Sequence, residues 1–121
     1  MQKRKQKELW APVKGFPLYE CSQLGNVRNV NTKQVLRPQE VTKNHYFQYN
    51  LYNKGKNKFL YAHRIVALAW CLNPYNLPEV DHINGIKSDN RAINLCWITH
   101  RDNCRKAVAM RCWINLPKGS R

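Results

Sequence analysis

Acidic side chains are scarce in this chain. Seven aspartates and glutamates stand against 21 lysines and arginines in 121 residues, so the formal net charge at pH 7 is +14. So large a charge on so short a chain predicts a polyanionic partner, and a nucleic acid, such as double-stranded DNA, is the first choice. A merely soluble basic surface and an RNA-binding or ribosome-associated protein are the alternatives that composition leaves open.

Long apolar runs are absent as well. No stretch approaches the length of a transmembrane helix, and the start MQKRKQK contains no apolar signal-peptide core. We find no amphipathic basic helix of the kind that lies on a membrane surface. The expectation is a protein without a membrane partner, kept in a reducing cytoplasm.

The five cysteines form no Cys-x-x-Cys pair, the spacing typical of zinc ribbons and knuckles. Cys96, Cys104 and Cys112 are evenly spaced, so zinc bound by these three thiols is an alternative. Buried free thiols are the simpler interpretation. We therefore expect no structural zinc, and a small core that forms without a metal.

Short strands and turns are predicted for the first half of the chain. A turn at residues 24–26 precedes a strand at residues 27–30. Apolar and polar side chains alternate over residues 46–52, which predicts a second strand, and the NKGK turn at residues 53–56 leads to a return strand at residues 57–62. These elements indicate a small antiparallel sheet.

Basic side chains on this sheet are candidates for DNA contact. A ribbon with a basic tip and a polar outer face has the size to enter a major groove, although an ordinary solvated hairpin is the alternative. The arm at residues 1–7 is either a solvated tail or a phosphate-contacting segment. The candidate DNA-binding residues are Arg28, Arg37, Lys43, Lys54, Lys56, Lys58 and, later in the chain, Arg105.

One helix and a second strand pair follow. Residues 63–71 carry a broad apolar stripe and end before a proline, which predicts a helix that begins at a structural His63. Residues 80–83 and 95–98 are apolar strands separated by a polar loop with an Asn-Gly turn. Thr99 is placed to cap a helix after them. The predicted fold class is α+β, with a connecting helix between two small β units.

Four side chains in this second half can be gathered in one site. Asp81 and His82 end the first of these strands, and Asn94 and Asn103 follow at the second strand and in the final helix. Carboxylate and carboxamide oxygens are hard ligands that suit Mg²⁺. A neutral histidine accepts a proton from water near pH 7. In a strongly basic protein, this combination points to metal-assisted phosphodiester hydrolysis.

The stretch VDHINGIKSDNRAINLCWITHRDN resembles the HNH, or ββα-metal, nuclease motif of phage and intron-encoded homing endonucleases. The resemblance implies that Asp81 and Asn103 bind one Mg²⁺, for which Mn²⁺ substitutes, and that His82 is the general base. Asn94 would hold that base through its backbone or support the loop. His100 is a further active-site candidate that faces the metal and phosphate or else marks an exposed helix start.

A second resemblance lies upstream of the motif. Trp10, the Gly15-Phe16 pair, the YECS tetrapeptide at residues 19–22 and GNVR at residues 25–28 match the NUMOD-type module that precedes HNH motifs in homing endonucleases. The implied organisation is a basic arm at 1–7, a β-sheet DNA-binding module with its connecting helix at 8–76, the ββα-metal motif at 77–112 and a tail at 113–121.

Together the resemblances imply a divalent-metal-dependent DNA endonuclease that leaves 5′-phosphate and 3′-hydroxyl ends. The interpretation we favour is a site-specific nicking homing endonuclease of a phage or mobile intron, acting as a monomer in the host cytoplasm. A dimer that makes double-strand breaks, a restriction or packaging nuclease, and a DNA-binding protein with a vestigial nuclease motif are the alternatives. The sequence does not reveal the DNA target.

Overall fold

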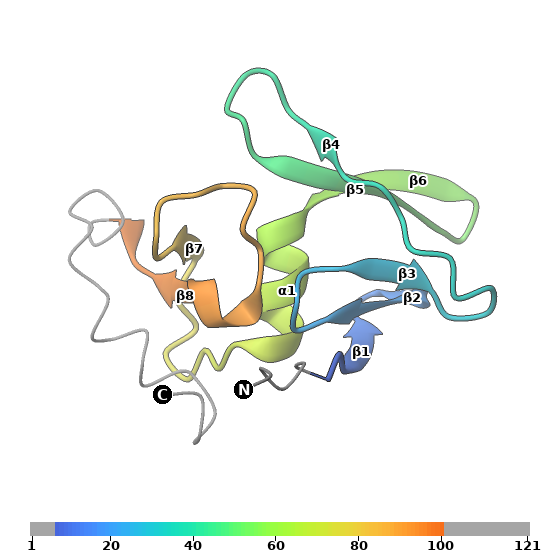
Figure 1. Cartoon of the computed structure of the whole chain (residues 1–121), viewed down its shortest axis with the longest axis horizontal. Helices are drawn as coiled ribbons and strands as arrows, with labels where there is room; N and C mark the ends of the chain where they lie inside the picture. The colour runs from blue at the N-terminus through green and yellow to red at the C-terminus, as the bar shows by residue number, and fades with distance from the viewer. Residues whose placement is uncertain (1–6, 101–121) are drawn as a thin grey trace, which may run out of the picture.

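The computed structural model describes residues 7–100, in which small antiparallel sheets surround one helix (Figure 1). This arrangement confirms the α+β class. The C-terminal helix that we expected after Thr99, together with Asn103 and Arg105, lies outside the described residues. The elements are β1 Trp10–Val13, β2 Phe16–Ser22, β3 Val27–Asn29, β4 Gln39–Glu40, β5 Phe47–Asn53, β6 Lys56–Tyr61, α1 Ala62–Trp70, β7 Glu79–His82, the 3₁₀ turn η1 Ala92–Asn94 and β8 Leu95–Ile98.

The first sheet has the strand order β1-β2-β3 and is antiparallel throughout. Its edge strand β1 contains Pro12, which is tolerated there because an edge strand can do without one ladder hydrogen bond. The register shifts between Pro12 and Val13, so that Val13 pairs with Phe16. Pro12 is therefore compatible with its place in the edge strand.

The second sheet has the order β4-β5-β6 and contains the predicted hairpin. Strands β5 and β6 are joined by Lys54 and Gly55 alone, with φ angles of 53° and 81°. Two successive positive φ angles in a two-residue loop are those of a type I′ turn, whose twist matches that of the flanking strands. Tyr49 and Leu51 point inward from β5 and are buried.

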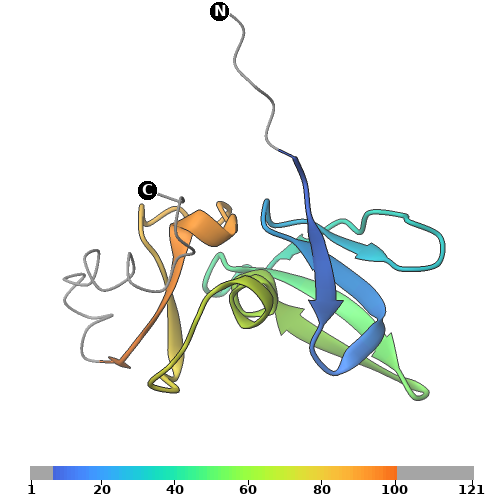
Figure 2. The same cartoon turned by 90° about the horizontal axis from the view of Figure 1, so that it is seen from below.

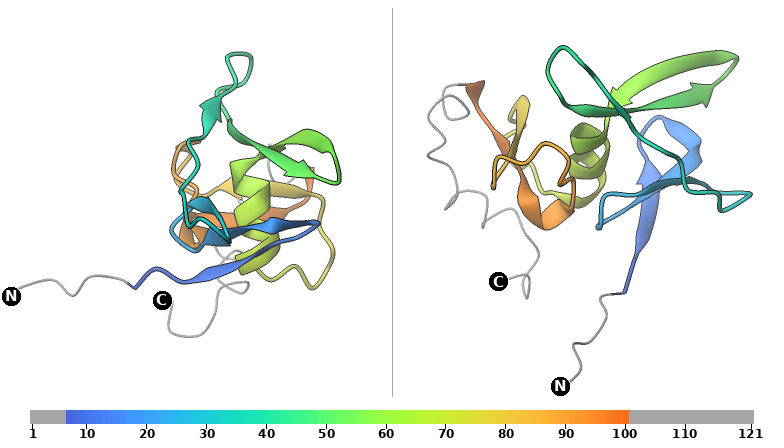
Figure 3. Two further views of the ribbon diagram at one scale, coloured as in Figure 1. Left: turned by 90° about the vertical axis from the view of Figure 1, so that its right-hand side faces the viewer. Right: turned by 45° about the horizontal axis from the view of Figure 1, so that its top comes forward.

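Helix α1 packs into two cores at once. Ala62 and Ile65 join a core formed with the two N-terminal sheets, including Val27 and Leu51. A second core lies between the helix and the β7–β8 pair. It contains Val66, Ala67 and Cys71 from the helix and its C-terminal end, and Val80, Leu95 and Trp97 from the strands. Figures 2 and 3 show α1 between the N-terminal sheets and the β7–β8 hairpin.

The single helix in the described part of the chain is too short to cross a membrane. Its length is set by the sequence at both ends. Tyr61 at its start is still extended, and Cys71 returns to an extended conformation at its end while its N–H bonds to the carbonyl of Ala67. The proline at position 74 follows shortly, as expected for a helix terminus.

Candidate active site

Asp81 and His82 lie at the end of β7, in a short antiparallel pair with β8. Asp81 is opposite Cys96 and His82 is opposite Leu95. The chain turns directly after them, because the N–H of Gly85 donates to the carbonyl of His82 at 2.8 Å and Gly85 has a φ of +78°. Both side chains are buried, with 4% of each residue exposed.

The loop after His82 is closed by the side chain of Asn94. Its Oδ1 accepts a hydrogen bond from the N–H of Asn84 at 3.0 Å, and its Nδ2 donates to Asn84 Oδ1 and to the carbonyl of Asp89, each at 2.9 Å. The backbone carbonyl of Asn94 accepts from the N–H of Ile83 at 2.8 Å. The side-chain bonds fit the role of a loop support, and the backbone bond beside His82 fits the other role left open for Asn94.

The middle of the loop is held by an ion pair. Arg91 donates from Nε and Nη2 to the two carboxylate oxygens of Asp89, at 2.8 and 2.7 Å. The Arg91 guanidinium and the amide of Asn84 hold the pKa of Asp89 down at about 2. The carboxylate therefore stays charged near neutral pH, where its ion pair with Arg91 stays formed.

Asn90, which the sequence analysis did not single out, contacts the ring of His82. Its Oδ1 lies 2.7 Å from His82 Nε2, and only 9% of Asn90 is exposed. The loop contains three asparagines, at positions 84, 90 and 94, and nothing in the local sequence distinguishes the one that reaches the imidazole. The contact depends on the path of the loop, which tertiary packing determines.

Aromatic rings cover the face of His82. The ring centroid of His63 is 5.0 Å away, and that of Tyr46 is 6.0 Å away with an interplanar angle of 21°. His63 is itself buried between Tyr46 and Tyr61, at 4.8 and 5.4 Å. The packing role expected of His63 agrees with these contacts.

Burial lowers the pKa of His63 to about 3, with smaller contributions from His82 and from the charge of Arg64. His63 Nδ1 is also buried without a hydrogen-bond partner among the described residues. Because the unfolded chain binds a proton near pH 6.5 and the folded chain does not, stability falls as the pH drops below that value.

We expect His63→Phe to remove part of this acid sensitivity. Between pH 7 and pH 5 the wild type should lose about 2 kcal/mol of unfolding free energy through His63, and the variant should not. Urea unfolding at both pH values measures the difference. The matched control is His45→Phe, whose side chain is 69% exposed and which should lose as much stability as the wild type. Equal losses in both variants would contradict the assignment.

His100 lies at the other end of β7 from His82. Its Nδ1 is 3.0 Å from Oε2 of Glu79, and its side chain is 79% exposed. Among the alternatives for this residue, the exposed position at the end of β8 is the one that these contacts favour.

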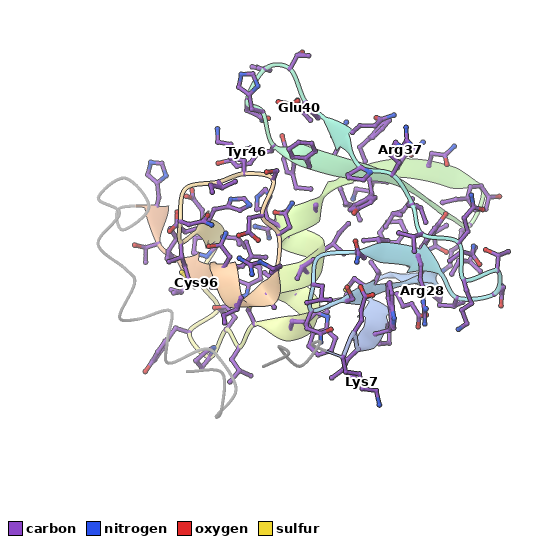
Figure 4. All side chains as sticks on the ribbon, in the orientation of Figure 1. Lys7, Arg28, Arg37, Glu40, Tyr46 and Cys96 are labelled. Carbon is purple, nitrogen blue, oxygen red and sulfur yellow. The ribbon has the colours of Figure 1, made fainter. Side chains whose placement is uncertain are left out.

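The candidate DNA-binding residues fall into two groups. Arg28 forms an ion pair with Glu20, and its guanidinium carbon lies 3.8 Å from the centre of the Trp10 ring, so its charge is already partnered. Figure 4 shows Arg28 against the first sheet and Arg37 beside β5. The exposed group comprises Arg37, Lys43, Lys54, Lys56 and Lys58.

A further cation, Lys87, was not among the candidates and lies close to the site. Its Nζ donates to the carbonyl of Asn44 at 2.7 Å and is 4.5 Å from the centre of the Tyr46 ring. Tyr46 in turn packs near His82. A positive charge is thus held beside the rings that cover the imidazole.

The turn between β2 and β3 packs against the loop that carries Asn90. The N–H of Ala92 donates to the carbonyl of Gln23 at 2.8 Å. A Cβ added at Gly25 would lie 2.9 Å from the backbone oxygen of Asn90, and Gly25 has a φ of +95°. The close approach therefore requires glycine at this position.

We expect Gly25→Ala to destabilise the fold by about 3 kcal/mol, from strained backbone and from the clash with Asn90. The matched control is Gly15→Ala, because Gly15 has a similar φ of +82° but open space around it. It should cost about 1 kcal/mol from backbone strain alone. Chemical denaturation of both variants measures the difference, and equal costs would show that the turn does not press on the loop.

The cysteines differ from the expectation of five free thiols. Cys21 and Cys71 are free and buried, and burial raises the pKa of their thiols to about 11 and about 12. Cys96, in contrast, is disulfide-bonded, so the prediction is wrong for this residue. Within residues 7–100 no group of three or more histidine, cysteine, aspartate or glutamate side chains is arranged to bind a metal.

Comparison with known proteins gives consistent matches over both halves of the chain. The NUMOD4 motif matches residues 8–52, and an HNH endonuclease family matches residues 60–105. HNH endonuclease L247 of Acanthamoeba polyphaga mimivirus is 40% identical over 111 residues, which are 86% of this chain and 27% of that protein. DNA endonuclease I-HmuI of Bacillus phage SP01 is 31% identical over 110 residues, 90% of this chain and 62% of that protein.

The fold also matches a solved structure. A structure of DNA binding and cleavage by the HNH homing endonuclease I-HmuI superposes with a TM-score of 0.75 at 28% sequence identity, over 86% of this chain and 60% of that one. The chain thus spans less than two thirds of each of these relatives.

Proposed function

Since the chain belongs to the HNH endonucleases of the homing type, with a NUMOD4 module ahead of the HNH motif, we propose that it hydrolyses phosphodiester bonds in DNA. The observation that carries the proposal is the buried Asp81-His82 pair at the end of β7, with the His82 ring held at its edge by Asn90 and on its face by aromatic rings. A histidine so restrained is suited to accept a proton from a water molecule.

The donor set fits a hard divalent cation. Asp81 supplies a buried carboxylate next to His82, and Asn103 would supply a carboxamide oxygen. Two protein oxygens are enough for Mg²⁺, which retains several waters, and Mn²⁺ should substitute for it. When bound, the cation supplies charge stabilisation at the phosphate and at the departing 3′-oxygen.

In the proposed reaction, His82 acts in the proton transfer and Asn94 acts as a support. His82 accepts a proton from water, and the resulting hydroxide oxygen bonds to phosphorus. The bond from phosphorus to the 3′-oxygen breaks, and that oxygen takes a proton from solvent. The products carry 5′-phosphate and 3′-hydroxyl ends. Asn94 takes no part in the proton transfer and instead keeps the loop closed through its bonds to Asn84 and Asp89.

The exposed basic residues of the N-terminal module would bind the DNA. Lys54 and Lys56 lie at or next to the hairpin turn, with Arg37 and Lys43 on the connection around β4. Contacts of this kind to phosphates hold a duplex in register without reading its sequence. Arg105 would add a contact from beyond the described residues, whereas Arg28 is less available because it is paired with Glu20.

One active site makes one cut, so we propose that the protein acts as a monomer and nicks a single strand. The test is to incubate a pool of supercoiled plasmids carrying genomic fragments with the protein, in Mg²⁺, Mn²⁺ or EDTA. Open circles should accumulate with either metal and not with EDTA. Linear DNA that forms without an open-circle stage would contradict the proposal that a monomer nicks a single strand. Tight binding with no cleavage in either metal would favour the vestigial-motif alternative.

A further inference from the structure

Resting on the proposed function, we propose that Asn90 is a positioning residue that keeps the proton of neutral His82 on Nε2, so that Nδ1 is the atom that accepts a proton from water. Asn90 Oδ1 lies 2.7 Å from His82 Nε2, a short distance for such a pair. A carboxamide oxygen can only accept a hydrogen bond, so the ring nitrogen that faces it must donate. The other nitrogen then carries the lone pair.

Burial strengthens this preference. His82 is 4% exposed and Asn90 is 9% exposed, so little water competes for either partner. With the Asn90 amide oriented so that Oδ1 faces the ring, a proton on Nδ1 instead would place two lone pairs against each other at 2.7 Å in a poorly solvated site. A buried acceptor left without a donor costs about 1–3 kcal/mol, and that is enough to leave one tautomer dominant.

The orientation of the ring is restrained in two directions. The rings of His63 and Tyr46 cover the imidazole and limit its tilt. The bond to Asn90 limits rotation within the ring plane. Neither restraint alone determines where Nδ1 points, and together they do.

Asn90 is itself held from both sides. On one side, its neighbour Asp89 is bonded through its carboxylate to Arg91 and through its carbonyl to Asn94. On the other side, Gly25 from the N-terminal module packs against the backbone of Asn90. The N-terminal module therefore contributes to the placement of the base. Asn94 acts on His82 indirectly, through Asp89 and Asn90. Such support is what keeps a catalytic group within a narrow range of geometry.

The experiment uses the full chain labelled with ¹⁵N in its histidine rings, without metal, at a pH where the imidazoles are neutral. Long-range ¹H–¹⁵N correlation spectra report which nitrogen of His82 carries the proton, and His82→Gln identifies the signal. We expect Nε2–H in the wild type and in Asn90→Asp, which keeps the acceptor oxygen. Asn90→Leu should give a mixture of tautomers.

Cleavage rates are measured on the same proteins at saturating DNA. Asn90→Leu should lower the rate about 10- to 100-fold with DNA affinity unchanged, a loss typical of groups that orient a catalytic ligand. Asn90→Asp should retain most of the activity. The matched control is Ser88→Ala, an exposed position in the same loop, which should cleave as the wild type does.

Each result of these experiments either supports or overturns the inference. A proton on Nδ1 in the wild type would overturn the inference, as would a folded Asn90→Leu variant that cleaves at the wild-type rate. If Asn90→Leu does not fold, the wild-type spectrum and the Asn90→Asp variant still decide the tautomer. Absence of cleavage by the wild type would overturn the proposed function and the catalytic role of Asn90, whereas the spectrum would still report the hydrogen bond independently.

Discussion

Replacing His82 by alanine should lower the rate of DNA cleavage by about 10²–10⁴-fold, the range typical of a lost general base. The imidazole is the proton acceptor in the proposed reaction, and no described neighbour can replace it. His63 is adjacent, but its pKa of about 3 makes it a poor base. DNA affinity should be unchanged, because the exposed lysines of the module are untouched.

The measurement is single-turnover cleavage at saturating protein, with affinity followed separately by gel shift in EDTA. His45→Ala is the matched control, since His45 is an exposed histidine paired with Glu40 in the connection between β4 and β5. A His82→Ala protein that binds DNA and still cleaves within a few-fold of the wild type would exclude His82 as the base. Circular dichroism checks that the buried substitution leaves the fold intact.

Replacing Asp81 by asparagine should reduce cleavage by about 10³-fold or more, since a bound cation contributes several kcal/mol to the transition state. The substitution keeps the size and shape of a side chain that is 4% exposed, so packing in the β7–β8 pair should survive. What it removes is the negative charge that we propose binds the metal. Metal affinity should fall together with activity.

A second readout separates metal binding from catalysis. The wild type should gain thermal stability when Mn²⁺ is added, because a ligand that binds only the folded state stabilises it, and the Asp81→Asn variant should gain much less. The control is Asp89→Asn, which removes a carboxylate that is bonded to Arg91 in the same loop. It should keep the Mn²⁺ response. An Asp81→Asn variant with a normal Mn²⁺ response and normal cleavage would remove Asp81 from the metal site.

Much of the fold could be predicted because short-range signals determine it. The alternation around Tyr49 and Leu51 and the Lys54-Gly55 turn predicted the β5–β6 hairpin, and β8 has the expected bounds of Leu95–Ile98. Strands β1 and β2 were harder to predict, since Pro12 and Pro17 are typical of loops, whereas here they lie in an edge strand and near the start of a central strand. A proline cannot donate a ladder hydrogen bond, so the register of these strands depends on where the sheet can tolerate a missing bond. That is a property of the assembled sheet.

The site, too, has residues that could be predicted from the sequence and contacts that depend on the fold. The motif places Asp81, His82 and Asn94 on adjoining elements, and its spacing is visible along the chain. Asn90 reaches His82 only through the path of a twelve-residue loop, 83–94, that other bonds hold closed. Arg28 was predicted as a DNA contact from its charge, whereas Glu20 and the Trp10 ring partner it across the sheet. Charge can be read from the sequence, but the partners of a charge require the fold.

The double packing of α1 has a consequence for recombination between related genes. One set of its side chains matches the N-terminal sheets and another matches the β7–β8 pair, so a crossover on either side of the helix leaves one matched set facing an unfamiliar partner. The turn at Gly25 adds a third matched contact, to the loop that carries Asn90. Exchange of the N-terminal half would therefore require compensating changes in the helix and in this turn. Substitutions at exposed positions of the hairpin leave both cores intact, so this surface can change without disturbing the packing of the helix.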